Sequence, residues 1–416
     1  MVEIAFVRSN SVNLIFQQSR IFVYLPFYFK TKLFTKLSSS YFFYFAVAGL
    51  FIPYLGLFLD DKHFDSREIG EILAIVTATK IFGPSLWAMF ADKTGQQLSV
   101  IRLGALLSCL SFVVLAWLDG YWLVTLFLSL LTLFWSAILP QMEVMTQNSI
   151  RRSAKIYARI RLWGSIGFIV LAVASGEIIA AFSGQAFVYL GTFVLFFLWL
   201  TTLWLKQPTI KTSAIVKQSS IVSKLLTVRF ALFFLSGIFL QISFAPFYGF
   251  FALYLRDFSY PAYAAGLLIG LGVVAEVFVF INAGKIFKHF DIKSVLVFSI
   301  FVSAIRWFLM AKYPENIYLL AFSQLLHAAG FGLFHSASIL FLQQHFDMNQ
   351  QSRAQAIYIG GVYGIGGAIG AFAAGIFWLD GKGAEHTFVL AAVAAFIGAF
   401  IVLFMPNSHA RLNKSI

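Results

Sequence analysis

The feature that most constrains this chain is a series of twelve long apolar segments separated by short polar ones. Each segment is close to the ~20 residues that an α-helix needs to cross the hydrocarbon core of a bilayer. The strands of a membrane barrel need only ~10 residues of alternating polarity, and an open sheet edge cannot face lipid. We therefore predict an all-α integral membrane protein with twelve spanning helices. The segments fall at about 39–60, 68–91, 98–118, 121–146, 157–182, 186–206, 228–256, 262–287, 292–312, 316–344, 354–379 and 386–405.

The composition excludes a soluble domain. Hydrophobic residues make up 60% of the chain and charged residues only 11%, whereas soluble domains have about 25% charged residues. A net charge of +13 would suggest nucleic acid binding in a soluble protein. Here, however, the basic residues lie in short loops between apolar segments. The expected environment is therefore the lipid bilayer, and no nucleic acid partner is expected.

The basic residues also predict how the helices are oriented. If the amino terminus is cytoplasmic and the segments alternate, 23 of the 30 Lys and Arg residues fall on the cytoplasmic side, five on the other side and two inside helices. Loops that stay in the cytoplasm carry such an excess of positive charge. We expect a multi-pass protein of a bacterial inner (cytoplasmic) membrane, with both termini cytoplasmic.

A polar, lysine-containing stretch divides the chain into two halves of six segments each. Each half contains a pair of glycines three residues apart: Gly164 and Gly167 in the first half, and Gly364 and Gly367 in the second. Small residues let helices pack closely in lipid. Duplicated halves around a midplane site are typical of secondary transporters. The predicted domains are a cytoplasmic extension at 1–37, which a mis-assigned start codon could also explain, the first half at 38–206, the linker at 207–227, the second half at 228–406 and a cytoplasmic tail at 407–416.

This organisation resembles the major facilitator superfamily. The loop after the second segment of that superfamily carries Gly-x-x-x-Asp-Arg-x-Gly, and the matching positions here are Ala88, Asp92, Lys93 and Gly95. The resemblance implies that Asp92, Lys93 and Gly95 form a cytoplasmic gating loop, in which the Asp accepts free amides at a helix N-terminus. A plain solvated loop is the alternative.

The stretch from Tyr157 to Phe168 is more specific, because it contains Arg159-x-Arg161-x-x-Gly164. It resembles the branch of lactose permease and the nucleoside:proton symporters, and most closely the phenylpropionate permease-like group, over about 38–406. The resemblance implies that Glu143 and Arg161 bind substrate. The alternative is a salt bridge between their two helices.

Ionisable residues inside apolar segments are the remaining candidates, because each costs several kcal/mol in a membrane without a partner or a water-filled cavity. Glu276 could carry a proton, since burial raises a carboxyl's affinity for one. Arg306 stays charged and needs an acceptor, either Glu276 in a structural ion pair or an anionic substrate. His327 could bind substrate or relay protons, whereas His335, two turns on, could simply be a packing residue. Lys80 lies too deep to reach the membrane surface and is expected to face a cavity.

The resemblance to lactose permease extends to Glu276, Arg306 and His327. One position departs from it: where that permease has a proton-carrying acid three residues after the histidine, this chain has Gly330. Any proton coupling must therefore use another group, and Glu276 is the well-buried acid of the second half.

These residues predict a secondary transporter of a small organic solute. Proton-coupled symport of an aromatic carboxylate fits the 18% aromatic content and the cations Lys80, Arg161 and Arg306. Symport of a sugar or nucleoside, or efflux of amphipathic compounds by antiport, remain alternatives. An enzyme is not expected, because no nucleophile–base pair or metal cluster is apparent. No cofactor or metal is expected, the single Cys109 excludes an intrachain disulfide, and we expect a monomer.

Overall fold

The computed structural model describes residues 27–150, 153–207 and 220–406. Across these residues, twelve helices are long and apolar enough to cross a membrane, which confirms the all-α prediction. Each predicted apolar segment overlaps one of these helices. The largest difference is in the first, which begins at Phe27, inside the predicted extension, and contains a candidate span from Leu33.

Several of the spans contain more than one helical element, and two of them include π-helical turns. The elements are α1 (Phe27–Asp61), α2 (Ser66–Thr94), α3 (Gln97–Val114), η1 (Leu115–Trp117), α4 (Tyr121–Trp135), α5 (Ile138–Ser149), α6 (Ala154–Phe182), α7 (Gln185–Leu203), α8 (Val222–Leu225), α9 (Val228–Asp257), α10 (Ala264–His289), α11 (Ile292–Lys312), α12 (Ile317–His327), the π-helix η2 (Ala328–Leu333), α13 (Phe334–His345), α14 (Gln351–Tyr358), the π-helix η3 (Ile359–Gly366), α15 (Gly367–Trp378) and α16 (Ala384–Leu403).

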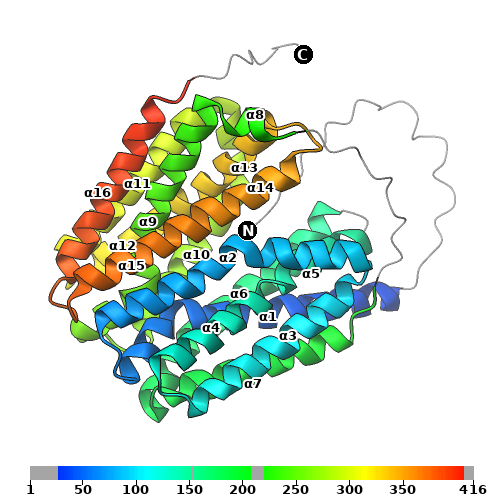
Figure 1. The fold of residues 1–416 in the computed structure, drawn as a ribbon, viewed down its shortest axis with the longest axis horizontal. Coiled ribbons are helices and arrows are strands. Elements are labelled where there is room, and N and C mark those ends of the chain that lie inside the picture. The colour runs from blue at the N-terminus through cyan, green and yellow to red at the C-terminus, as the bar shows by residue number, and fades with distance from the viewer. Residues whose placement is uncertain (1–26, 151–152, 208–219, 407–416) are drawn as a thin grey trace.

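The helices form two groups, α1–α7 and α9–α16, which lie against each other (Figure 1). Three helix pairs make the main contact between the groups: α2 with α15, α6 with α10, and α1 with α9. Gly70 of α2 and Gly375 of α15 abut so closely that a Cβ on either would overlap the other's backbone. Small residues at such crossings bring helices together in lipid. We call the two groups the N-half and the C-half. The predicted linker lies largely at 208–219, outside the described residues, as do 1–26 and the tail 407–416.

Local signals at the ends of α2 explain where it begins and ends. Asp65 accepts a hydrogen bond from the amide of Glu68 and the Glu68 carboxylate accepts one from the amide of Asp65, which is a capping box. At the other end, Gly95 adopts φ +65°, a left-handed conformation that glycine adopts without strain and that commonly terminates helices. This Gly95 is the last residue of the predicted gating loop.

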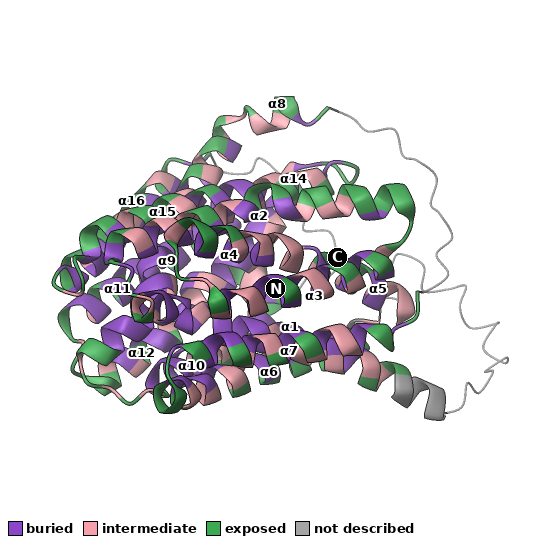
Figure 2. Ribbon diagram, turned by 60° about the horizontal axis from the view of Figure 1, so that its bottom comes forward, coloured by how far each residue is buried: buried purple, intermediate pink, exposed green. Residues whose placement is uncertain are grey.

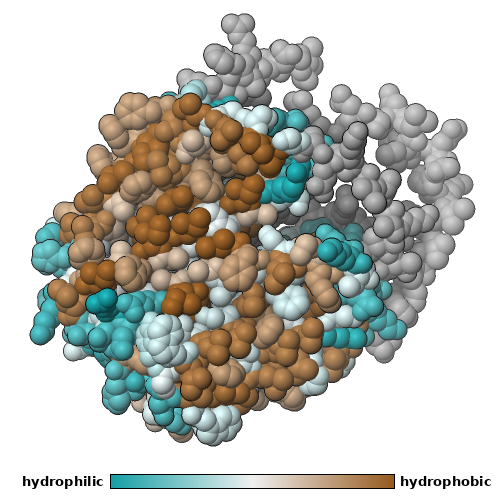
Figure 3. Space-filling model, in the orientation of Figure 1, coloured by the Kyte–Doolittle hydropathy of each residue, from teal (hydrophilic) through white to brown (hydrophobic). Residues whose placement is uncertain are grey.

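The outer surface of the helices is apolar, as a lipid environment requires. Large apolar side chains such as Trp122, Phe278 and Ile281 are about two-thirds exposed or more. Figure 3 shows a broad apolar surface with hydrophilic patches toward its two ends, and Figure 2 shows the buried residues gathered on the inner faces of the helices. A water-soluble monomer does not expose so large an apolar area.

The N-half and C-half are latched together at one end of the bundle, which we call the far end because it lies opposite the linker. Arg256 at the end of α9 donates to Asp60 at the end of α1 over 2.6 Å. The Asp380 carboxylate, in the loop after α15, accepts from the backbone amide of Ser66 at 3.0 Å and from its hydroxyl at 2.6 Å. The Asp380 amide donates back to the Ser66 hydroxyl at 2.7 Å. One half therefore caps the first turn of α2 in the other.

At the opposite end, which we call the linker end, the halves are separated by a cleft of about 440 Å³. It lies between the end of α2 and the start of α14. A second hollow, of about 500 Å³, lies beside the latch at the far end, between the start of α2 and the end of α15. The two ends differ in that the contacts Arg256–Asp60 and Asp380–Ser66 join the halves at the far end. The cleft at the linker end is lined by Ser85, Ala88, Met89, Asp92, Lys93, Ser352, Arg353 and Ala356.

Replacing Asp380 by Ala is expected to loosen the far end, because it removes both hydrogen bonds that Asp380 accepts from Ser66. Hydrogen bonds to a charged group contribute about 1.5–3 kcal/mol. The measurement uses a background protein in which Cys109 is replaced by Ser and Leu73, which is buried in the α2–α9 contact, by Cys. In this background, Asp380→Ala should raise the rate of labelling by a thiol reagent about fivefold or more. Lys382→Ala, in the same loop, is the control and should leave labelling unchanged.

The same latch has an expected pH dependence. The hydrogen bonds from Ser66 hold the pKa of Asp380 below its ordinary value of 3.8. A lowered pKa means that the closed end favours the ionised carboxylate, so its stabilisation is complete at neutral pH and is lost as pH falls through that lowered pKa. Labelling at Leu73→Cys should therefore be constant between about pH 5 and 8 and rise only below about pH 4. A rise near pH 6 would mean that another group controls the latch.

Candidate functional site

Four polar side chains of the C-half form one buried chain of contacts near the middle of the membrane. Glu276 from α10 lies with its Oε1 2.6 Å from Nε2 of His327 on α12. Arg306 from α11 donates through Nη1 to His327 Nδ1 at 2.9 Å and through Nη2 to the Gln324 carbonyl oxygen at 2.9 Å. His327 therefore lies between Glu276 and Arg306, for which a direct ion pair was one of two predictions.

The geometry determines which nitrogen of His327 carries the proton. A guanidinium can only donate, so His327 Nδ1 must be the acceptor of the bond from Arg306. The ring proton is then on Nε2 and points at the Glu276 carboxylate. In this arrangement His327 is neutral and lies between the Glu276 carboxyl group and the Arg306 guanidinium. A change in the protonation of Glu276 would act on Arg306 through one imidazole.

Arg306 is fully buried and held between aromatic rings. Its guanidinium carbon lies 4.2 Å from the ring centre of Phe247 and 4.2 Å from that of Trp307. Trp307 is itself fixed, because its Nε1 donates to the Ser243 hydroxyl at 3.0 Å. Ring faces attract a desolvated cation, so the aromatic side chains of α9 and α11 help to keep this charge inside the membrane.

Glycines explain how the three helices come close enough for these contacts. Gly330 in η2 lies directly against the Ser303 hydroxyl, one turn before Arg306. Gly272 on α10 lies against the His327 ring, where a Cβ would be only 3.2 Å from Cδ2. The π-helix η2 starts immediately after His327, and π-helical turns are frequent at functional sites. Gly330, which replaces the acid of lactose permease, thus has a packing role here.

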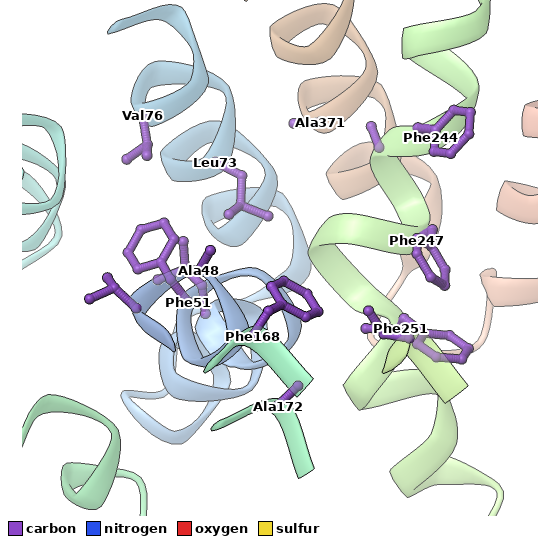
Figure 4. Packing of buried hydrophobic residues seen from close by; sticks show 14 of the residues in the cluster. Ala48, Phe51, Leu73, Val76, Phe168, Ala172, Phe244, Phe247, Phe251 and Ala371 are labelled. Atoms are coloured by element: carbon purple, nitrogen blue, oxygen red, sulfur yellow. The ribbon is translucent and has the colours of Figure 1, made fainter. Parts of the chain in front are cut away.

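In the N-half, Lys80 lies at the centre of α2 and faces the inside of the bundle. Leu73 and Val76, on the same stripe of the helix, are buried and point inward in Figure 4. The apolar residues Ile75 and Phe82 are exposed on the other side of α2. Lys80 is nevertheless exposed and, among the described residues, has no hydrogen-bond or ion-pair partner. Its ammonium therefore faces accessible space within the bundle.

Arg161 and Glu143 each contact an aromatic residue of the N-half. The Arg161 guanidinium carbon lies 3.7 Å from the ring centre of Phe45, and its Nε has no hydrogen-bond partner. Glu143, within α5, accepts from the Tyr157 hydroxyl at 3.3 Å. Arg161 therefore keeps an unused donor at Nε, and substrate binding and a salt bridge between the two helices both stay predictions.

Arg161 and Glu276 lie at the same depth, on helices that pack together across the two halves. Gly266 of α10 packs against the backbone of Ala172 in α6. From that crossing, Arg161 and Glu276 are both displaced toward the linker end, by about 16 Å and 15 Å at 1.5 Å per residue. Arg161 and the C-half network therefore occupy one layer of the bundle.

The remaining predicted residues lie where helices from the two halves meet or pack. Asp92 and Lys93 line the linker-end cleft opposite Ser352 and Arg353, which start α14. Asp92 and the first turn of α14 thus line the same cleft, and the gating role of Asp92, Lys93 and Gly95 stays a prediction. The four packing glycines each face a neighbouring helix: Gly164 faces Phe45, Gly167 faces Phe42, Gly364 faces Ile81 and Gly367 faces Thr77.

Gln324 is a site residue that sequence analysis missed. It is fully buried, lies three residues before His327, and holds Arg306 in place. Its amide nitrogen donates in turn to the Ser323 hydroxyl at 3.0 Å. A polar residue one turn from a candidate histidine in an apolar segment was the available signal.

Comparison with known proteins agrees with this architecture. The model of the MFS_1-like family matches residues 34–390. The chain is 27% identical over 368 residues to a probable 3-phenylpropionic acid transporter of Escherichia coli (strain K12), covering 86% of this chain and 95% of that protein. It is 23% identical over 381 residues to the uncharacterized transporter YwbF of Bacillus subtilis (strain 168), covering 90% and 94%.

Solved structures show the same fold. A point variant of the nucleoside transporter NupG superposes with a TM-score of 0.81 at 19% identity, covering 90% of this chain and all of that one. A peptide transporter POT superposes with a TM-score of 0.73 at 12% identity, covering 90% and 94%. These relatives are transporters and not enzymes, as the sequence predicted. The chain belongs to the MFS_1-like family and is a multi-pass secondary transporter of the major facilitator type.

Proposed function

We propose that this chain is a proton-coupled symporter that imports a small aromatic carboxylate. The observation that carries the proposal is the Glu276–His327–Arg306 chain, an acid and a base buried at mid-membrane and joined by a neutral imidazole. The side-chain carboxylate of Glu276 in this network is suited to bind a proton on one side of the membrane and release it on the other. The E. coli relative, which is called a probable 3-phenylpropionic acid transporter, supports the substrate class.

The two halves would then have different roles. Lys80 of the N-half is exposed and has no hydrogen-bond or ion-pair partner among the described residues, and Arg161 has an unused donor at Nε, so we assign the substrate's carboxylate to these two cations. Arg306 is already bonded to His327 and Gln324, so we assign it to the proton site. Glu143 with Tyr157 would border the substrate on the side of α5.

The excess of basic residues at the linker end supports an orientation with that end and both termini in the cytoplasm of a bacterium. On this topology the far-end latch faces the exterior, so the described conformation corresponds to an inward-open state. Asp92, Lys93 and Gly95 would then close the cytoplasmic side when the halves rock.

Uptake by proteoliposomes tests this proposal. We expect 3-phenylpropionate to accumulate when an inward proton gradient is imposed and only to equilibrate without one. Lactose and uridine, tested in parallel, should not accumulate. Accumulation of uridine or lactose would mean that the substrate is a nucleoside or a sugar and not an aromatic carboxylate. Proton-driven extrusion of the solute would mean that the protein is an antiporter and not an importer.

Lys80→Gln is expected to weaken binding of the carboxylate selectively. Hydrogen bonds to charged groups contribute about 1.5–3 kcal/mol, which corresponds to a roughly 10- to 100-fold loss of affinity. Binding of 3-phenylpropionate should fall by this factor, whereas binding of the neutral 3-phenylpropanol should change little. Lys285→Gln, an exposed lysine near the linker end of α10, is the matched control. Equal losses for acid and alcohol would assign Lys80 a structural role.

A further inference from the structure

A second polar cluster of the C-half, separate from the Glu276 network, lies between the two π-helical segments. His335 of α13 is buried, and its Nδ1 lies 3.3 Å from the hydroxyl of Tyr363 in η3. The Tyr358 hydroxyl lies 3.5 Å from that of Tyr363. The Phe331 ring of η2 lies parallel to the His335 ring at 6.4 Å and meets Tyr363 edge-on. Side chains from two π-helical turns thus meet at His335 and Tyr363.

One atom of this cluster is left without a partner. His335 is only 2% exposed, and its Nε2 is buried and makes no hydrogen bond among the described residues. A buried polar atom that stays unpaired costs about 1–3 kcal/mol, so an unpaired imidazole nitrogen beside a half-buried tyrosine needs a reason. A packing histidine would be expected to satisfy both nitrogens or to be replaced by an apolar residue.

The cluster has the chemistry to bind a hydroxyl group. No described carboxylate pairs with His335, so the imidazole and the phenol of Tyr363 form a neutral site that can both donate and accept. A hydroxyl is the complementary group, because it also donates and accepts, whereas a carboxylate is better served by the cations Lys80 and Arg161. Phe331 offers an apolar face next to it for a ring.

The position of the cluster agrees with a role in the same binding space. Ile81, the residue after Lys80, packs against Gly360 and Gly364 of η3, and Gly364 follows Tyr363 in the chain. The cation of α2 and the His335–Tyr363 pair therefore lie at one depth, on opposite sides of the boundary between the halves. A solute that spans this boundary would reach both.

We propose that His335, held by Tyr363, is a specificity-determining residue that binds a ring hydroxyl of the substrate, so that the solutes carried are hydroxylated aromatic acids. This inference rests on the proposed function for the acid group and adds the hydroxyl. His335 Nε2 makes the bond, while Tyr363 and Tyr358 fix the ring through Nδ1.

Binding to the purified full-length protein tests the inference with two pairs of ligands. In the first pair, 3-phenylpropionate is compared with 3-phenylpropionate that carries a ring hydroxyl at position 3 or 4. In the second pair, 3-phenylpropanol is compared with 3-phenylpropanol that carries a ring hydroxyl at position 3 or 4. Wild type should bind one hydroxylated isomer at least about tenfold more tightly than its parent in both pairs. No preference in either pair would overturn the inference.

Two variants of His335 separate a ligand contact from a structural role. In His335→Gln the amide lies near the former Nε2, so the hydroxyl preference should be retained. In His335→Asn the amide lies near the former Nδ1, so the bond to Tyr363 can persist while the preference should fall to about one. The opposite pattern, with preference kept by Asn and lost in Gln, would overturn the inference. The difference between acids and alcohols tests the proposed function separately, because hydroxyl preference can stand even if alcohols bind as well as acids.

Discussion

Replacing Glu276 by Gln is expected to abolish accumulation driven by a proton gradient while leaving exchange of solute across the membrane intact. The amide oxygen can still accept the proton of His327 Nε2, 2.6 Å away in the wild type, so the network should keep its shape. The amide cannot, however, take up or release a proton. With one proton per solute, each unit of pH gradient supports about a tenfold accumulation ratio. A gradient of two units should therefore give about a hundredfold in wild type and about onefold in Glu276→Gln.

Two measurements make this prediction specific. Counterflow, in which labelled solute enters in exchange for unlabelled solute without a gradient, should proceed within about threefold of the wild-type rate if alternation still occurs. Glu177→Gln, which changes an exposed acid of α6, should accumulate solute as wild type does. Full accumulation by Glu276→Gln would show that protons are carried elsewhere, and loss of counterflow would show that Glu276 is needed for substrate binding or for rocking.

The fold was predictable from the sequence because membrane helices are specified by local composition. The segment at 292–312 was predicted with the bounds that α11 has, since apolar length alone determines a span. The first helix was harder. Its beginning at Phe27 lies in a stretch with Lys30, Lys32 and Lys36, which hydropathy counts as a loop. A helix can continue past the apolar core into the polar interface, so polarity there does not determine where the helix begins.

The candidate site was only partly predictable. Glu276, Arg306 and His327 stood out because a charge or imidazole in an apolar segment is rare. Their order of contact could not be inferred, because it depends on the rotation of three helices, on the close approach at Gly330 and on a π-helical turn that no residue pattern specifies. The Asp380–Ser66 latch was missed for a similar reason, since it joins residues 314 positions apart.

Arg306→Met is expected to cause a large loss of stability, because it leaves the buried Glu276 carboxylate without its positive counterpart. Breaking a buried charge pair by removing one partner costs about 3–5 kcal/mol. In a protein of this size that corresponds to a fall of roughly 3 to 6 °C in apparent Tm. Arg256→Met, the same substitution in the half-exposed pair with Asp60, should lower the apparent Tm by no more than about 2 °C, since such pairs contribute less than about 1 kcal/mol.

The double variant Arg306→Met with Glu276→Gln tests whether charge balance is the reason. If His327 transmits the interaction between the two groups, the double variant should recover part of the loss and show a coupling of about 1 kcal/mol or more, the range found for residues in one network. The measurement is apparent Tm at one scan rate for the wild type, both single variants and the double variant. Losses that simply add would mean that Arg306 stabilises the protein through Phe247, Trp307 and Gln324 alone. In that case a change in the protonation of Glu276 would not act on Arg306 through His327.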